Sequence, residues 1–287
     1  PYGRLLRLDE PDALVGLLQA HQLLCDWGAM PGLLRDVLAR EGEGIDPFVL
    51  LSHDVPPGRL RRAGQTFGKK VAAGVLPVPA RRVGTEGRIR IGYLSADFRD
   101  HAVATLVAEV LERHDRDAFA IHAYATKDGS QSRFHPRLAA AVETWRAAHD
   151  LDDDMLARTI AADGIDILVD LGGWTADHSM RALAMRPAPV QVSWLGYAAS
   201  SGVPWMDYVL LDPVAAPPGC EAEFSERILR LPDCFQPNDR QRPVADAPAR
   251  AAEGLPPEGV VFAAFASPNK ISPAVWDAWL RILSAVP

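Results

Sequence analysis

The sequence predicts an α/β protein with a Rossmann-like, doubly wound parallel sheet, preceded by a short α-helical region and followed by the start of a second Rossmann-like lobe. Three observations lead to this prediction. From Arg88 onward, apolar segments of strand length alternate with segments of helical periodicity. Upstream of Arg88 only helical spacing is found. After a stretch rich in Pro, Ala and Asp, a new apolar segment starts at Val260.

Residues 1–86 are predicted to form a helical hairpin and a linker. Apolar side chains recur at helical spacing between residues 12 and 40, with a break at Pro31, which indicates two short helices packed against each other. The stretch over residues 55–88 is rich in Pro, Gly and Arg and predicts a loop with one or two helical turns.

Residues 87–240 are predicted to form the first lobe. Strands and helices alternate there as in a parallel sheet with crossover helices. The helix expected near residues 152–162 has Asp150 as its predicted cap. The other helices are expected at residues 105–114, 134–142 and 178–185, and the strands at 89–94, 119–125, 144–147, 165–171, 208–211 and 228–231 and within 186–197.

Residues 241–258 are predicted to be a linker, and residues 259–287 the first strand and helix of a second Rossmann-like lobe. The strand is expected over residues 260–266. The helix is expected to begin with Ser272 as cap and Pro273 as first residue, with Trp276 and Trp279 packed inward. The rest of this lobe is expected beyond the last residue.

The composition is that of an ordinary globular protein. With 287 residues, of which 48% are hydrophobic, the chain can bury a large core. A net charge of −7 argues against non-specific nucleic-acid binding. No segment approaches the roughly 18–20 apolar residues of a membrane span. Three dispersed cysteines predict neither a disulfide framework nor a zinc site. We expect no nucleic acid, no membrane and no metal cofactor, and a cytoplasmic location.

The segment from Arg186 to Tyr197 is the most informative one in the chain. Its two prolines hold the backbone extended, Val190 and Val192 suit the core of a sheet, and Gly196 lets another group approach the main chain closely. The pattern alone favours a core strand with a turn over a strand that brings backbone to a ligand.

Two loops at predicted strand ends carry groups suited to catalysis, and ligands of such sheets bind beyond the carboxyl ends of strands. The first loop holds His101, which can accept a proton near neutral pH, with Asp97 and Asp100 near enough in sequence to orient it. The second holds Lys270 before a helix start, where free N–H groups favour an anion. The local patterns alone favour plainer roles, namely a surface or helix-start histidine and a solvated lysine.

Several separated motifs occur in register along the chain: Ile-Gly-Tyr-Leu-Ser-Ala-Asp-Phe over residues 91–98, Gly-Gly-Trp-Thr over 172–175, the segment 186–197, Ser-Gly over 201–202 and Met-Asp-Tyr over 206–208. In order and spacing they resemble the catalytic region of the O-linked N-acetylglucosamine (O-GlcNAc) transferases, glycosyltransferase family 41. The resemblance implies the two-lobed GT-B fold, in which residues 259–287 begin the C-terminal, nucleotide-binding lobe. Because most of that lobe is expected beyond residue 287, the 287-residue piece alone should be inactive. Relatives usually carry tetratricopeptide repeats upstream, of which the predicted hairpin would be the tail.

The resemblance also implies an inverting transferase that moves N-acetylglucosamine from UDP-GlcNAc to Ser or Thr hydroxyls of a protein or peptide acceptor, without a metal. His101 and Lys270 match the family's catalytic positions. The expected substrate-binding residues are Asp97, Leu195, Gly196 and Tyr197. Either His101 or a phosphate oxygen of the donor takes the proton from the acceptor.

The chain departs from the family's pattern near the sugar and the nucleotide. It has Ala198 and Ala199 where many relatives have Pro-Gly, Thr105 where they often have histidine, and Ser267 and Asn269 where they often have glutamine and tyrosine. The donor sugar and the nucleotide contacts therefore stay open. Two alternatives are a UDP-sugar epimerase of similar two-lobed fold and a non-catalytic protein-binding scaffold with a degenerate pocket.

Overall fold

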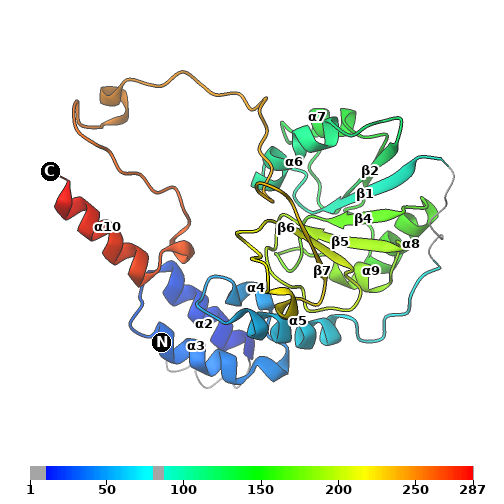
Figure 1. Cartoon of the computed structure of the whole chain (residues 1–287), viewed down its shortest axis with the longest axis horizontal. Coiled ribbons are helices and arrows are strands. Elements are labelled where there is room, and N and C mark those ends of the chain that lie inside the picture. The colour runs from blue at the N-terminus through cyan, green and yellow to red at the C-terminus, as the bar shows by residue number, and fades with distance from the viewer. Residues whose placement is uncertain (1–10, 80–86, 287) are drawn as a thin grey trace. The chain divides into compact units, whose positions relative to one another are not determined.

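The computed structural model describes residues 11–79 and 87–286, and the chain divides into two compact units (Figure 1). The larger unit is Asp46–Arg242. The smaller one combines Pro1–Ile45 with Pro243–Pro287. Within the described residues, no helix has both the length and the apolar character needed to cross a membrane.

The larger unit is built on a seven-stranded sheet in which all strands are parallel, in the order β3-β2-β1-β4-β5-β6-β7. This order runs outward in both directions from the β1–β4 pair, which confirms the predicted doubly wound α/β sheet. The strands are β1 (Ile89–Ser95), β2 (Phe119–Ala125), β3 (Thr144–Ala147), β4 (Ile167–Asp170), β5 (Val190–Trp194), β6 (Tyr208–Leu211) and β7 (Arg227–Arg230).

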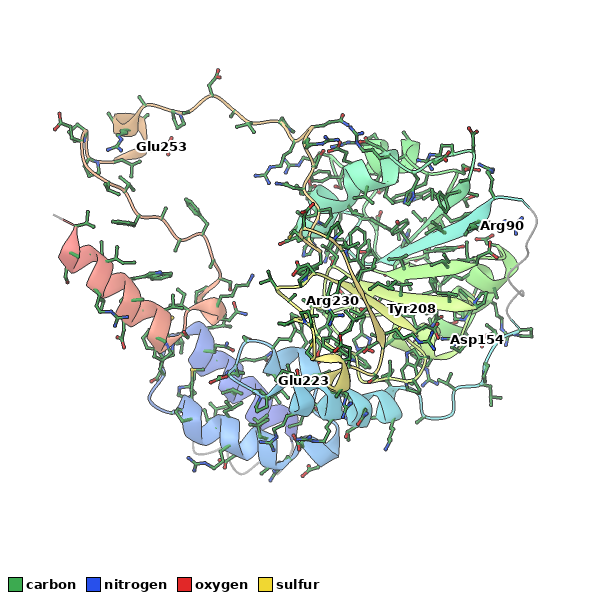
Figure 2. The ribbon with its side chains drawn as sticks, in the orientation of Figure 1. Arg90, Asp154, Tyr208, Glu223, Arg230 and Glu253 are labelled. Atoms are coloured by element: carbon green, nitrogen blue, oxygen red, sulfur yellow. The ribbon has the colours of Figure 1, made fainter. Side chains whose placement is uncertain are left out.

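Helices cover both faces of the sheet, as parallel strands require. Val107 and Leu111 of α6 pack with Val169 and Val192 on one face, whereas Leu183 of α9 packs on the other, beside α8. Figure 2 shows the side chains that fill these layers. The helices are α6 (Ala102–Glu112), α7 (His135–Ala140), α8 (Asp153–Ala162) and α9 (Met180–Ala184).

The cap of α8 is Asp152, so the prediction of Asp150 is wrong. The Asp152 carboxylate accepts a hydrogen bond from the Met155 N–H at 2.8 Å. A capping side chain must lie two or three residues before the N–H that it serves. Asp150 lies too early in the chain for this bond, and its side chain is exposed beside His149.

The stretch predicted as a loop over residues 55–88 contains a 15-residue helix, α5 (Pro57–Val71), preceded by α4 (Pro47–Leu50). Its glycines are sites of close packing rather than breaks. A Cβ on Gly64 would overlap the carbonyl oxygen of Ser201, and one on Gly68 would overlap the Val203 side chain. Only a helix with bare positions there can lie against this loop.

The helices α4 and α5 belong to the larger unit, which therefore begins at Asp46 instead of residue 87. The ring of Phe67 on α5 packs edge-on against Trp174, with the ring centroids 5.1 Å apart. This contact joins α5 to the same core cluster as α8 and α9. Residues 80–86 of the predicted linker lie outside the described residues.

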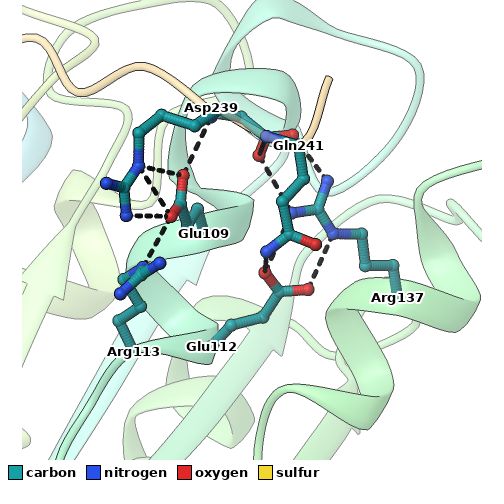
Figure 3. A network of polar contacts seen from close by, with 7 residues as sticks. Glu109, Glu112, Arg113, Arg137, Asp239 and Gln241 are labelled. Atoms are coloured by element: carbon teal, nitrogen blue, oxygen red, sulfur yellow. Dashed lines mark hydrogen bonds and ion pairs between the residues drawn. The ribbon is translucent and has the colours of Figure 1, made fainter. Parts of the chain in front are cut away.

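A network of ion pairs fixes the last residues of the larger unit to α6 and α7 (Figure 3). Glu109 accepts from the Arg240 N–H at 2.8 Å and from its Nη2 at 2.6 Å. Arg137 donates to Glu112 at 2.7 Å and to Asp239 at 2.5 Å. The Glu109 and Asp239 carboxylates are only 6% and 1% exposed, and the contact with Arg240 lowers the pKa of Glu109 to about 2. Buried charges of this kind are stable only when paired, so these ion pairs hold the backbone at Asp239 and Arg240.

The smaller unit is helical in its described residues. As predicted, α2 (Pro11–Leu23) and α3 (Met30–Ala39) pack against each other. Trp27, between them, contacts α10 (Pro273–Ala285): its ring lies 6.1 Å from that of Trp276, and its Nε1 donates to the Ile271 carbonyl at 3.2 Å. Short 3₁₀ turns are η1 (Glu41–Glu43), η3 (Arg250–Glu253) and η4 (Pro268–Lys270), and the larger unit has η2 (Glu221–Glu223).

The prediction of a strand over residues 260–266 is wrong. The segment has no regular structure, and Phe265 is fully exposed. A strand needs a neighbour for its backbone hydrogen bonds, and the described part of this unit has no other strand.

The predicted cap of α10, Ser272, does accept from the Val275 N–H at 3.3 Å. No described residue of α10 is buried, however, so the predicted inward packing of Trp276 and Trp279 is not found.

Candidate active site

The carboxyl ends of β1, β4 and β5 form the candidate site. The sheet order reverses between β1 and β4, and ligands of doubly wound sheets bind outside such a switch point. The loop after β1 carries Asp97 and His101, the loop after β4 carries Gly172 and Gly173, and β5 runs into Leu195. Parallel register places these three loops at one edge of the sheet.

His101 is the N-cap of α6. Its backbone is extended, and its Nδ1 accepts a hydrogen bond from the Val103 N–H at 3.3 Å. The imidazole is 44% exposed and therefore accessible from solvent. The plainer interpretation of this histidine, a helix-start contact, is thus correct. It explains why α6 begins three residues before the predicted start.

The Asp97 carboxylate lies 3.5 Å from the same Nδ1 atom of His101. One ring nitrogen cannot accept from an amide and donate to a carboxylate at the same time, so the two contacts belong to different tautomers. When Nδ1 accepts from Val103, the proton is on Nε2. When Nδ1–H donates to Asp97, Nε2 is free to accept a proton from a hydroxyl.

Only one of the two acids predicted to orient His101 lies beside it. The Asp97 N–H donates to Ser95 Oγ at 2.9 Å, which holds the loop at the end of β1. Asp100 instead pairs with Arg133 at 3.2 Å. The structure therefore gives the orienting position to Asp97.

Leu195 has a φ of +78°, a region that side chains other than glycine rarely adopt. The Gly196 N–H donates to the Trp194 carbonyl at 3.1 Å and closes a γ-turn of the rare positive-φ kind. A residue held in such a conformation costs about 1–3 kcal/mol, and this strain is concentrated at functional sites. The surrounding structure must therefore impose the turn.

Gly196 lies where main chain approaches main chain, as predicted, and the approaching group is the protein's own backbone. Its N–H also donates to the Leu171 carbonyl at 3.1 Å. A Cβ on Gly196 would overlap that oxygen and would lie 3.0 Å from the Gly172 carbonyl oxygen. The loops after β4 and β5 are therefore in direct backbone contact.

The Tyr197 side chain lies in the core rather than in the site, which corrects the expectation that it binds substrate. It is 1% exposed, belongs to the same buried cluster as Trp174, and burial raises the pKa of its hydroxyl. Gly173 has a φ of +60° and lies close to the Cβ of Tyr197, so a side chain at position 173 would overlap that atom. The buried Tyr197 side chain thus packs against the loop after β4 at Gly173.

Asp170 is the last residue of β4. It was not predicted as a site residue because it closes an apolar segment. It is 3% exposed, and its carboxylate accepts from the N–H groups of Gly173 at 2.8 Å and Gly172 at 3.2 Å. Burial raises the pKa of Asp170 to about 6, against the opposing effect of these two bonds. An acid at the end of a buried strand, directly before a Gly-Gly pair, is the signal that could have identified it.

The loop that departs from the family's pattern is anchored by a buried carboxylate. Glu226, 5% exposed, accepts from the Ser201 N–H at 2.7 Å and from Ser200 Oγ at 2.8 Å, and the Ser201 hydroxyl also donates to it. The Trp174 Nε1 donates to the Ser201 carbonyl at 2.8 Å. These bonds hold the loop without the Pro-Gly pair that many relatives have.

Lys270 lies in the smaller unit. It ends η4, is exposed, and precedes the capped start of α10. His101 belongs to the larger unit, so the juxtaposition of these two residues stays a prediction. Among residues 11–79 and 87–286, no group of three or more His, Cys, Asp or Glu side chains is placed to hold a metal ion.

The lobe that carries this site is of the Rossmann-like type found in GT-B glycosyltransferases. The family model of glycosyl transferase family 41 matches residues 73–246, and the chain belongs to this family.

Among similar proteins, the probable UDP-N-acetylglucosamine-peptide N-acetylglucosaminyltransferase SPINDLY of Arabidopsis thaliana is 36% identical over 208 residues, which are 70% of this chain and 22% of that protein. The SEC protein of the same plant, with the same enzyme description, is 31% identical, over 73% of this chain and 22% of its own length. A solved structure of a mutant O-GlcNAc transferase from Thermobaculum terrenum has a TM-score of 0.75 and 29% identity, covering 96% of this chain and 53% of that one. The chain thus spans about a fifth of the curated relatives that it matches.

Replacing Gly196 by alanine tests the close approach at the γ-turn. Because the new Cβ would overlap the Leu171 oxygen, we expect Gly196→Ala to lower the free energy of unfolding by about 1–3 kcal/mol in urea titrations. Gly172→Ala is the matched control, since its Cβ would meet only Thr175 Oγ1 at 3.5 Å and Asp170 Oδ1 at 3.6 Å. Wild-type stability of the Gly196 variant would contradict the backbone contact.

The stability of the chain should depend on pH through Asp170. Its pKa of about 6 in the folded state exceeds the ordinary value of 3.8, so the folded state binds the proton more tightly. The contribution of this group to stability therefore falls as pH rises from about 4 to about 6, by up to about 3 kcal/mol. Urea titrations across this window should show Asp170→Asn gaining stability relative to wild type. A difference that stays constant with pH would show that Asp170 does not titrate in this range.

Proposed function

We propose that this protein is an inverting glycosyltransferase that moves N-acetylglucosamine from UDP-GlcNAc to Ser or Thr hydroxyls of proteins. The observation that carries the proposal is the pair of His101 and Asp97, placed at the switch point of a family 41 lobe. The enzyme names of the relatives support the donor and the acceptor.

In the proposed reaction, the acceptor oxygen attacks the anomeric carbon and UDP leaves in a single displacement, which inverts that carbon. With Nδ1–H of His101 on Asp97, Nε2 accepts the proton of the attacking hydroxyl. A phosphate oxygen of the donor is the competing proton acceptor. The turn at Leu195 and Gly196 forms the sugar-side wall of the site.

Lys270 and the first N–H groups of α10 neutralise the departing diphosphate in this proposal. A lysine beside a helix start combines its own charge with the helix dipole, and such stabilisation acts as charge develops on the leaving group. The reaction uses no metal. We place it in the cytoplasm, and the free thiols of Cys25, Cys220 and Cys234 support a reducing compartment.

Calorimetric titration of UDP into the full-length protein tests the proposal. We expect saturable binding, and consumption of UDP-GlcNAc only when an acceptor peptide is present. Consumption without a peptide would indicate a UDP-sugar epimerase instead. The absence of any binding heat at high micromolar UDP would indicate a non-catalytic scaffold and would remove both enzyme functions.

Lys270→Ala should lower turnover of the full-length protein by about 10²–10³-fold, the typical loss when one group that stabilises transition-state charge is removed. Fold should be preserved, because Lys270 is exposed. Far-ultraviolet circular dichroism checks the fold, and Lys69→Ala, which removes another exposed lysine, is the control. Unchanged turnover would take Lys270 out of the mechanism.

A further inference from the structure

The γ-turn at Leu195 is held by the loop after β4. Leucine does not favour a φ of +78°, and the one hydrogen bond inside the turn joins Gly196 N–H to the Trp194 carbonyl. The same N–H also bonds the Leu171 carbonyl at 3.1 Å, and Gly196 lies against the oxygens of Leu171 and Gly172. The position of these two carbonyls therefore determines whether the turn forms.

The conformation of the loop after β4 is in turn fixed by Asp170. Its carboxylate bonds the N–H groups of both Gly172 and Gly173. Gly173 is thereby held at a φ of +60°, a left-handed conformation, with its Cα against Tyr197. The Thr175 hydroxyl closes the loop by donating to the Gly172 carbonyl at 2.9 Å.

A buried carboxylate is a costly way to hold two N–H groups, because its charge loses the solvation of water. The pKa of Asp170 is shifted only by its burial and by those two hydrogen bonds. In the described residues no cation pairs with its carboxylate. Ser193, its neighbour in register on β5, is also buried, and its hydroxyl has no partner among those residues. Water could accept hydrogen bonds from these two N–H groups in an exposed turn without the desolvation of a buried carboxylate. The buried position of Asp170 therefore indicates a role beyond packing.

We propose that Asp170 is a positioning residue, which sets the Leu195 γ-turn at the sugar-side wall by way of the Gly172–Gly173 turn. It does not touch substrate. Its carboxylate fixes two amides, these fix the Leu171 and Gly172 carbonyls, and the carbonyls hold Gly196. The functional part of this inference rests on the proposed function, because the turn forms a donor wall only if the protein binds a sugar nucleotide.

The first test uses the ¹⁵N-labelled 287-residue chain and compares amide hydrogen exchange at Gly196 in wild type, Asp170→Ala and Asp170→Asn. We expect exchange to be faster by about tenfold or more in the alanine variant, and by a smaller factor in the asparagine variant, which keeps one acceptor oxygen. Amides of β2 should be unchanged. The matched control is Asp166→Asn, because Asp166 is also buried and bonds one N–H, that of Arg90, at the opposite end of β4.

Unchanged exchange at Gly196 in folded Asp170→Asn and Asp170→Ala would overturn the inference. If the alanine variant does not fold, the asparagine variant decides, and a crystal structure of that variant gives the φ of Leu195 directly. Equal acceleration at Gly196 and throughout β2 would also overturn it, because that result means global destabilisation.

The second test measures steady-state kinetics of the full-length Asp170→Asn protein. A positioning role raises KM for the donor by about tenfold while KM for the acceptor stays within about twofold. A merely structural role lowers the active fraction, so that kcat falls and both KM values stay constant, which would contradict the inference. If the wild-type protein itself neither binds nor consumes UDP-GlcNAc, the proposed function fails, and the exchange experiment still decides the role of Asp170.

Discussion

Every strand in the described residues of the larger unit is parallel, and this constraint determines where the rest of its structure lies. Parallel strands need crossover connections, so all seven carboxyl ends share one edge, and helices must cover both faces. At that edge the ends of β4 and β5 are joined backbone to backbone through Leu171 and Gly196. The candidate site is therefore built on main-chain contacts between neighbouring loops, and the Asp170 carboxylate holds one of these loops through its two N–H groups.

The helix α5 packs closely against the loop after Tyr197. Gly64 and Gly68 bring the helix against residues 201–203, while Glu226 holds the same loop through Ser200 and Ser201. A segment that lies far upstream in the sequence thus supports the edge of the site. A change at Gly64 or Gly68 on α5 therefore displaces residues 201–203 directly.

Sequence periodicity was sufficient to predict the strands of the sheet. It was insufficient to predict segments whose conformation depends on contacts with distant residues. β2, β3 and β6 begin and end at the predicted residues, because strand length and composition are local properties. The helix α5 was missed since glycine weakens a helix locally, and only the close approach of residues 201–203 reveals its use. Residues 260–266 have the composition of a strand but no described partner to pair with. Likewise, nothing in a leucine indicates a positive φ at Leu195, because its neighbours impose that angle.

The two contacts of His101 make different demands on its ring. Bonding the Val103 N–H stabilises the start of α6 by about 0.5–2 kcal/mol, the usual worth of a cap, and leaves the proton on Nε2. The tautomer that can accept a proton from a hydroxyl gives up this cap. The Asp97 carboxylate offsets the loss with a charge-assisted hydrogen bond from Nδ1–H. The balance between the amide of Val103 and the carboxylate of Asp97 therefore determines how often Nε2 of His101 is free to accept a proton.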